Sequence, residues 1–267
     1  IVSGGGLVGL TAALHLSSLG RRVMLVEDRR PKNSKSTLGF DMRTVLLSPR
    51  SIDFINKALP IDAIRRQIVT EMKVWEMEGT GSINFRASEL GETTLGSVFE
   101  MFTLVDFLWD HLRSVEIECP ARITTVEEGK DTVTVKLSNG RVIHSNLLIV
   151  AEGSGSTTSQ MLEIKNRAFK CDDRAIVSIA QMASGHGNIA YQRFGKGPLA
   201  LLPLSPPDLV SVIWSVPGQS ASNPIANGAS KILKQEIEEI SGKVKKIDQI
   251  SQFAIQEFVV DDFNPYQ

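Results

Sequence analysis

The chain begins with a glycine-rich turn that restricts its fold more than any other stretch of the sequence. The first ten residues, IVSGGGLVGL, place four glycines between two apolar runs. Apolar residues then recur at helical spacing from Leu7 to Leu14, Gly20 ends the helix as a C-terminal cap, and a short apolar strand ends at Glu27. A strand, a helix and a second strand so close together predict a βαβ unit with a parallel sheet.

The spacing of the glycines indicates what this unit binds. Gly4, Gly6 and Gly9 match the pattern G-x-G-x-x-G between a strand and a helix, and the acid Glu27 follows about 20 residues later. Gly4 permits a tight turn, Gly6 lets a pyrophosphate approach the backbone, and Gly9 lets the helix pack closely on the strand. We therefore predict a dinucleotide site, in preference to a glycine turn without a ligand.

The residues beside these glycines complete the predicted site. The helix starts at Leu7 and Val8, so its free amides and partial positive charge would face the phosphates. Glu27 is expected to accept hydrogen bonds from an adenosine ribose, and Asp28 is expected to take part in cofactor binding beside it. After Glu27 the βαβ pattern stops, and a parallel strand returns only at residues 147–150, after a β-meander. This interrupted order favours FAD over NAD.

Bulk composition excludes several other classes of function. The chain has 267 residues, is 42% hydrophobic and 22% charged, and carries a net charge of −1, so a nucleic acid is not an expected partner. Cys119 and Cys171 lie far apart, fit no metal-ligand spacing and read as reduced thiols of a cytoplasmic protein. No apolar run reaches the roughly 18 residues of a membrane helix. Neither a metal site nor a catalytic side-chain triad is expected.

Further signals place helices and strands along the rest of the chain. Ser48 and Pro49 predict the cap and first turn of a helix. Thr103 with Asp106 resembles a capping box and predicts that another helix begins there. Strand patterns occupy residues 69–87, 115–150 and 175–216, which indicates a second, β-rich part beside the nucleotide-binding part.

Four stretches resemble a known family. They are GGGLVGLTAALHLSSLGRRVMLVE, MRTVLLSPRSIDFI, LLIVAEGSGSTTS and YQRFGKGPLALLPL followed by SVIWSVP, spread over residues 1–217. Together they resemble the FAD-dependent aromatic hydroxylases of the p-hydroxybenzoate hydroxylase type, and within that group the ubiquinone-biosynthesis hydroxylases. The resemblance implies an α/β fold with a Rossmann-like FAD-binding domain of the glutathione-reductase type and an α+β substrate domain built on a β-sheet.

The resemblance also implies domain boundaries and further site residues. The FAD-binding domain would comprise residues 1–68 and 101–167, and the substrate domain residues 69–100 and 168–267. Arg43 matches an arginine that reaches the FAD. The segment AEGSGS matches a D-G-x-x-S motif that contacts the cofactor phosphates, with Glu152 in place of the aspartate and Gly153 after it. The glutamate side chain is one carbon longer than that of the aspartate.

The family carries a second flavin motif, similar to G-D-A-A-H, which does not occur in residues 1–267. We therefore expect a chain that is truncated before this motif. By itself it should bind FAD weakly or not at all and be inactive.

The implied reaction is hydroxylation of an aromatic ring with FAD, O₂ and NADPH or NADH, through a C4a-hydroperoxyflavin. The implied substrate is a polyprenylated phenol of ubiquinone biosynthesis, with peripheral contact at the inner face of a membrane and a complex with other enzymes of that pathway. One alternative is a hydroxylase of a small soluble aromatic compound. Another is a non-catalytic family member, or a fragment, that acts as a partner protein.

Overall fold

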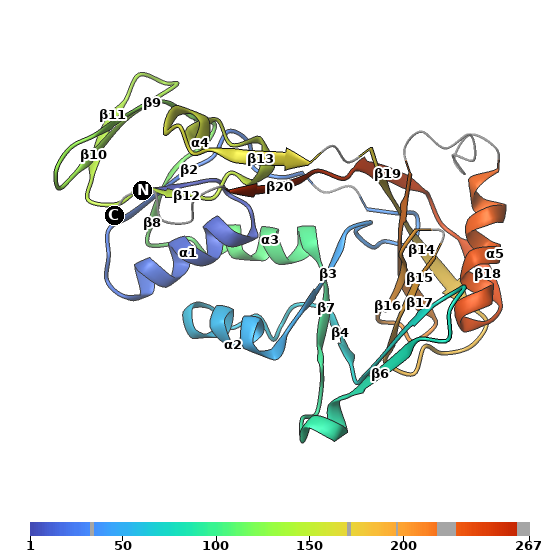
Figure 1. Ribbon diagram of the computed structural model, residues 1–267. Coiled ribbons are helices and arrows are strands. Elements are labelled where there is room, and N and C mark those ends of the chain that lie inside the picture. Colours follow the sequence, from blue (N-terminus) through green and yellow to red (C-terminus); the bar gives the residue numbers. More distant parts are fainter. Residues whose placement is uncertain (33–34, 170–171, 196, 218–227, 261–267) are drawn as a thin grey trace.

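The protein has two lobes joined by a narrow three-stranded sheet (Figure 1). A parallel sheet with its helices forms one lobe, and a large antiparallel sheet backed by one helix forms the other. The computed structural model describes residues 1–32, 35–169, 172–195, 197–217 and 228–260.

The parallel sheet is the βαβ unit predicted from the glycine turn. Its strand order is β12 (Ile149–Val150), β1 (Val2–Ser3), β2 (Val23–Val26) and β8 (Val115–Glu118). All three pairings are parallel, so the predicted return of the chain to this sheet near residue 149 is confirmed. The carboxyl end of β1 therefore leads into the glycine turn. The carboxyl ends of its two neighbours, β12 and β2, lie at the same edge of the sheet.

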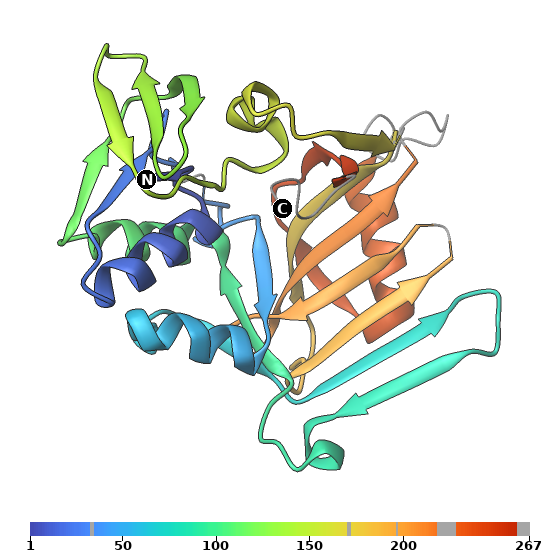
Figure 2. The same cartoon turned by 60° about the vertical axis from the view of Figure 1, so that its left-hand side comes forward.

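Three helices cover this lobe, and two of their ends form as predicted (Figure 2). They are α1 (Leu7–Ser18), α2 (Pro49–Ala58) and α3 (Met101–Asp110). Gly20 has a φ of +73° just after α1, as a C-terminal cap requires. Ser48 Oγ accepts a 3.2 Å hydrogen bond from the amide of Ser51 at the start of α2. Apolar residues from the three helices and the sheet form one core that includes Leu10, Ile52 and Leu108.

A β-meander packs on the opposite side of the parallel sheet. It consists of β9 (Ile123–Glu128), β10 (Val133–Leu137) and β11 (Val142–Ser145). A turn at Ser138, Asn139 and Gly140 joins β10 to β11, with Gly140 at a φ of +88°. Val135 and Leu137 are buried against Met24 and Val26 of β2.

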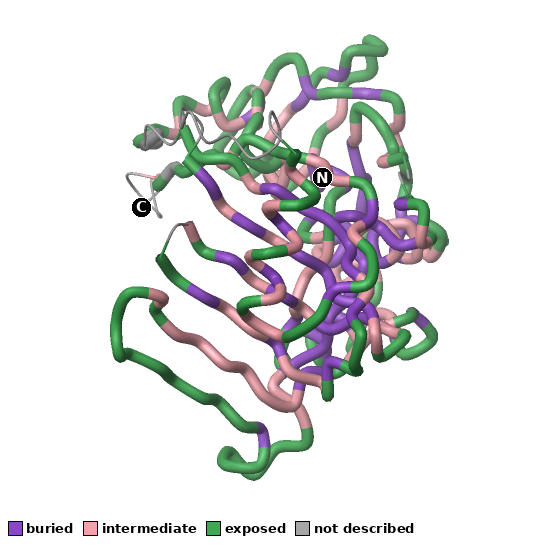
Figure 3. The backbone as a smooth tube through the Cα atoms, turned by 90° about the vertical axis from the view of Figure 1, so that its right-hand side faces the viewer, coloured by how far each residue is buried: buried purple, intermediate pink, exposed green. Residues whose placement is uncertain are grey.

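The large sheet forms the second lobe. Its order is β18 (Val244–Ile247), β14 (Arg174–Met182), β17 (Leu209–Val216), β16 (Leu199–Pro203), β15 (Ile189–Phe194), β5 (Glu71–Glu76) and β6 (Ser82–Arg86), with β19 (Ser251–Ala254) also paired to β14. Helix α5 (Ala229–Ser241) covers one face through Leu233 and Ile237, which pack with Leu201 and Trp214. The other face packs in part against the connecting strands through Val177 and Ile179, and the edge strand β6 is exposed along its whole length (Figure 3).

Two small sheets connect the lobes. The first has the order β3 (Thr44–Leu47), β7 (Gly96–Glu100) and β4 (Arg66–Val69), and the second pairs β13 (Asn166–Phe169) with β20 (Glu257–Val260). Short helical segments complete the chain: η1 (Ala87–Leu90), η2 (Gly153–Gly155) and α4 (Thr157–Met161). The predicted boundaries at residues 68, 100 and 167 thus fall in or beside connecting strands, and the division into domains stays a prediction.

The capping box predicted at Thr103 and Asp106 is wrong. Helix α3 begins at Met101, and its N-cap, Glu100, makes no side-chain capping bond. The helix start is stabilised instead by Asp41, whose carboxylate accepts hydrogen bonds from the amides of Phe102 at 2.7 Å and Arg43 at 3.0 Å. A capping partner that lies far away in the sequence leaves no local pattern, so the sequence did not reveal it.

Replacing Asp41 with alanine should lower the free energy of unfolding by about 1–3 kcal/mol, because two amides lose their acceptor in a buried place. Urea denaturation followed by circular dichroism would measure the loss. Asp53→Ala, at an exposed position on α2, is the matched control and should change stability by less than about 0.5 kcal/mol. Equal losses in the two variants would contradict the role given to Asp41.

Candidate functional site

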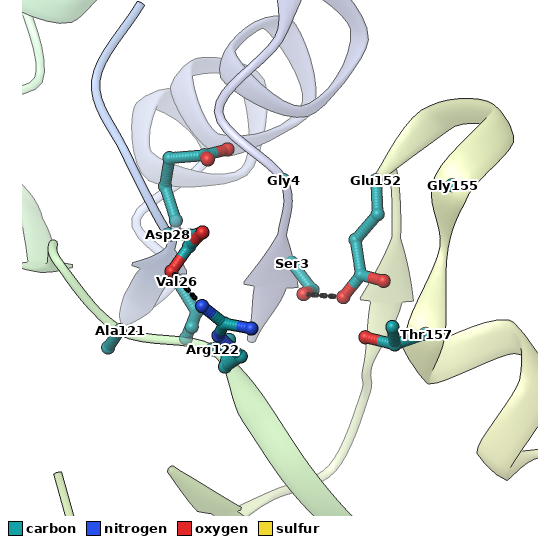
Figure 4. Close-up of a pocket in the computed structure, with 10 residues that line it drawn as sticks. Ser3, Gly4, Val26, Asp28, Ala121, Arg122, Glu152, Gly155 and Thr157 are labelled. Carbon is teal, nitrogen blue, oxygen red and sulfur yellow. Dashed lines mark hydrogen bonds and ion pairs between the residues drawn. The ribbon is translucent and has the colours of Figure 1, made fainter. Parts of the chain in front are cut away.

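A pocket of about 270 Å³ opens beside the glycine turn (Figure 4). It lies between the carboxyl ends of β1 and β2, the start of the meander and the segment that follows β12. The lining residues are Ser3, Gly4, Val26, Glu27, Asp28, Ala121, Arg122, Glu152, Gly155 and Thr157. Four of the ten residues predicted for cofactor binding thus line one pocket: Gly4, Glu27, Asp28 and Glu152.

Two of the motif glycines are required by packing. Gly4 has a φ of +109°, and a Cβ there would come within 2.3 Å of the carbonyl oxygen of Ala151. A Cβ on Gly9 would come within 1.9 Å of the carbonyl oxygen of Gly4. These contacts hold the turn against the strand β12 on one side and against α1 on the other, so no larger residue fits at either position.

Gly6 differs from both, because a Cβ there would meet nothing within 4 Å. It is the exposed N-cap of α1, has no side-chain capping bond, and is followed by Leu7 and by Val8, which is 72% exposed. The first amides of a helix have no partner within the helix. The open space at Gly6 and these amides lie where the motif predicts an anion, and the binding itself stays a prediction.

The fourth glycine, Gly5, has a role that the sequence did not indicate. A Cβ there would lie 2.4 Å from the indole of Trp109 on α3. The Trp109 Nε1 donates a 3.0 Å hydrogen bond to the Gly5 carbonyl, and the Gly5 amide donates to a carboxylate oxygen of Glu27. Helix α3 and the end of β2 thus fix the glycine turn from two sides.

Glu27 and Asp28 follow β2 and line the pocket, and their role at an adenosine stays a prediction. The other carboxylate oxygen of Glu27 accepts a 3.0 Å bond from the amide of Arg29. An ionised carboxylate has about four acceptor positions, so Glu27 keeps capacity for further donors. Asp28 forms a 3.0 Å ion pair with Arg122, and both side chains are exposed at the pocket (Figure 4).

Glu152 makes a dense set of hydrogen bonds within the chain. Its carboxylate accepts from the hydroxyls of Ser3, Ser156 and Thr158, and from the amide of Thr158 at 3.1 Å. Burial raises the pKa of the Glu152 carboxyl, but the bonds from Ser3, Thr158 and Ser156 outweigh it, so the pKa lies below its ordinary value. Glu152 is therefore ionised, and it joins β1 to the start of α4.

Besides Gly6, Leu7, Val8 and Gly9 at the turn, two more predicted residues, Gly153 and Arg43, lie outside this pocket lining. Gly153 begins η2 with a φ of +76°, a conformation that favours glycine. Arg43 is exposed just before β3, and its guanidinium lies 5.9 Å from the ring centre of Phe253 on β19. The resemblance placed Arg43 on the FAD, and the structure places it between the two lobes.

Several lining residues were not predicted from the sequence. Ser3 lies at the carboxyl end of β1, and Thr157 follows the carboxyl end of β12. Each is close in sequence to one of the two motifs, and this proximity is a signal from which they could have been predicted. Ala121 and Arg122 follow β8, and only the pairing of β8 with β2 brings them to Glu27. Among the described residues, no group of three metal-ligating side chains is found.

The different environments of Gly4 and Gly6 predict different effects of the same substitution. Gly4→Ala should lower the free energy of unfolding by about 3 kcal/mol or more, because it combines backbone strain with a clash. Gly6→Ala should stay within about 1 kcal/mol of the parent chain, since its Cβ enters open space. Urea denaturation of both variants tests this, and similar losses would contradict the geometry described for the turn.

The lowered pKa of Glu152 predicts a dependence of stability on pH. Its folded-state pKa lies below the ordinary value of 4.5, so ionised Glu152 stabilises the fold at neutral pH. This contribution is lost as the pH falls below 4.5 and through the folded-state pKa. Glu152→Gln should therefore be less stable than the parent chain at pH 7, with a difference that shrinks in acid.

The measurement is thermal unfolding at a series of pH values. Glu127→Gln, at an exposed position on β9, is the control and should show no such convergence. A constant difference between Glu152→Gln and the parent chain at every pH would show that Glu152 acts through shape rather than charge.

Comparison with proteins of known sequence agrees with this geometry. Over 221 residues the chain is 28% identical to 3-demethoxyubiquinol 3-hydroxylase of Escherichia coli, covering 80% of this chain and 56% of the relative. Over 241 residues it is 30% identical to the mitochondrial ubiquinone biosynthesis monooxygenase COQ6 of Caenorhabditis elegans, covering 83% and 52%. The chain thus spans about half the length of these curated relatives.

Solved structures share the fold. The p-nitrophenol 4-monooxygenase PnpA of Pseudomonas putida superposes with a TM-score of 0.73 at 15% identity, covering 98% of this chain and 69% of that one. HpxO of Klebsiella pneumoniae, solved with FAD and uric acid, superposes with a TM-score of 0.70 at 18% identity, covering 96% and 68%. The α/β fold with its Rossmann-like domain is therefore confirmed.

The sequence also matches the family described as FAD binding domain over residues 1–265. With the glycine turn, the parallel sheet and the pocket between them in place, this match shows that the chain belongs to the FAD binding domain family and is related to the ubiquinone-biosynthesis hydroxylases.

Proposed function

We propose that the chain binds the adenosine diphosphate half of FAD in the pocket beside the glycine turn. The observation that supports this most directly is the open cradle at Gly6, Leu7 and Val8, next to a pocket that ends at Glu27. In this arrangement the amides of the α1 start hold the pyrophosphate, and Glu27 accepts hydrogen bonds from the ribose. Arg122 and Asp28 border the adenosine end.

The whole protein is, in this proposal, an FAD-dependent monooxygenase that hydroxylates an aromatic ring. Bound FAD supplies the redox and oxygen chemistry, with NADPH or NADH and O₂ as co-substrates. The residues of this chain bind and orient. Glu152 fixes the segment after β12 against β1 through Ser3, and this bond keeps the floor of the pocket in place. Gly153 allows the following turn, and Arg43 lies toward the second lobe.

The proposed substrate is a polyprenylated phenol of ubiquinone biosynthesis. Support comes from the curated relatives at 28–30% identity, whose names place them in ubiquinone metabolism. A substrate of this kind lies in a membrane. No helix among the described residues is long and apolar enough to cross one. We therefore include peripheral contact with a membrane, and association with other enzymes of the pathway, in the proposal.

Ligand binding by this chain tests the adenosine assignment. ADP and FAD should compete for one site in isothermal titration, and FMN, which lacks the adenosine half, should not displace ADP. Glu27→Gln should weaken ADP binding by about tenfold or more, because it removes a charged hydrogen-bond acceptor worth about 1.5–3 kcal/mol. Glu127→Gln is the control and should bind as the parent chain does. Displacement of ADP by FMN would place the ligand elsewhere.

Turnover by the whole protein tests the reaction and the substrate separately. Oxidation of NADPH or NADH should be stimulated by a prenylated phenol, and one atom of labelled O₂ should enter the ring. Turnover of a small soluble phenol alone would overturn the substrate proposal and keep the enzyme class. Absence of any turnover by flavin-loaded protein would favour a non-catalytic partner protein.

A further inference from the structure

Strand β6 is an unprotected edge of the large sheet. It is the last strand in the order after β5, and all five of its residues are exposed (Figures 2 and 3). Its register with β5 runs without a bulge from Glu71 opposite Arg86 to Trp75 opposite Ser82. Proteins usually block such edges with charged side chains, proline or a bulge. Strand β6, with the sequence SINFR, has no proline, lysine or bulge, and its one charged residue, Arg86, lies at the end of the strand and is paired within the chain.

The ladder with β5 determines which backbone groups of β6 are free. The Glu76 amide bonds to the Gly81 carbonyl at 3.1 Å, and the Ala87 amide bonds to the Thr70 carbonyl at 2.9 Å. Hydrogen-bonded pairs alternate along an antiparallel ladder. The amides and carbonyls of Ile83 and Phe85 therefore point to β5, and those of Ser82, Asn84 and Arg86 point outward from the sheet.

These outward groups are complementary to a second copy of themselves. An antiparallel pairing with a two-fold axis at Asn84 sets Asn84 opposite Asn84 of the second copy, and Ser82 opposite Arg86. All three outward residues then form hydrogen-bonded pairs in both directions. Ile83 meets Phe85 of the second copy at a position where side chains come close, and no like charges face each other.

Side-chain exposure supports the same pairing. Ile83 is 57% exposed and Phe85 is 46% exposed. They share a face with Val74 and Met72 of β5, on the side of the sheet opposite α5. Arg86 is held within its own chain by Glu71 at 3.5 Å and Glu89 at 3.2 Å. Pairing would thus cover apolar surface and leave no charge without a partner.

We propose that two copies of this chain associate through their β6 edges into one continuous antiparallel sheet. The partner is a second copy of the chain. When two β6 strands pair about the two-fold axis at Asn84, their outward backbone groups bond to each other and their apolar side chains Ile83 and Phe85 meet. One strand pair buries less area than a standard protein interface, so the dimer forms reversibly and its population rises with concentration.

Cysteine cross-linking tests the register. In a chain with Cys119→Ser and Cys171→Ser, the variant Asn84→Cys should form a disulfide-linked dimer on mild oxidation, because its Cα atoms would lie about 5.5 Å apart. Ser82→Cys is the matched control. Its two copies would lie about 14 Å apart along the strands and should not cross-link. Equal cross-linking of both variants would overturn the proposed pairing.

Sedimentation velocity over a concentration series tests the association itself. The parent chain should shift from monomer towards dimer, and Asn84→Pro should stay monomeric because it removes only an outward amide. Phe85→Lys should also stay monomeric, since it places two positive charges against the paired strands. Circular dichroism identifies any variant that fails to fold. A parent chain that remains monomeric at all concentrations, or dimers that persist in a folded Asn84→Pro or Phe85→Lys variant, would overturn the proposal.

Discussion

The close contact between the glycine turn and strand β12 is the constraint on which the candidate site depends. Gly4 lies so near Ala151 that a side chain on Gly4 would meet the Ala151 carbonyl at 2.3 Å. This contact brings the segment after β12 to the turn, although more than half of the chain separates them in sequence. The Ser3 hydroxyl then reaches the Glu152 carboxylate, and the pocket has a floor. Without the parallel register of β1 and β12, the two motifs would not meet.

A second set of contacts joins the lobes. Asp248 is nearly buried, and its carboxylate accepts hydrogen bonds from the Thr37 hydroxyl and the Leu38 amide. Burial raises the pKa of Asp248, but bonds from Thr37, Gln249 and Leu38 outweigh it and hold the pKa below its ordinary value. Asp41, a few residues after Leu38 in the chain, contacts the start of α3. The segment from Thr37 to Asp41 is therefore tied to both lobes by carboxylates, which fixes the place from which Arg43 extends.

Local patterns predicted local structure well. The glycine spacing, the Gly20 cap and the Ser48–Pro49 start each depend on residues within a few positions, and each forms as expected. The start of α3 was misplaced because its stabilising partner, Asp41, comes from a distant loop. Arg122 was missed for the same reason, since only the pairing of β8 with β2 brings it to the pocket. Contacts between distant segments leave no periodicity and no spacing in the sequence.

The charges around the turn determine where an anion can bind. Glu27 and Glu152 stand on either side of the glycine turn, and Glu152 is ionised because its hydrogen bonds stabilise the charged form. A pyrophosphate is repelled by both carboxylates and attracted by the amides at the start of α1. In the proposed complex this favours a position at Gly6, where no Cβ intrudes, over one deeper in the pocket beside Glu152. The glutamate, one carbon longer than the aspartate of the related motif, accepts hydrogen bonds from Ser3 and Thr158 within the chain.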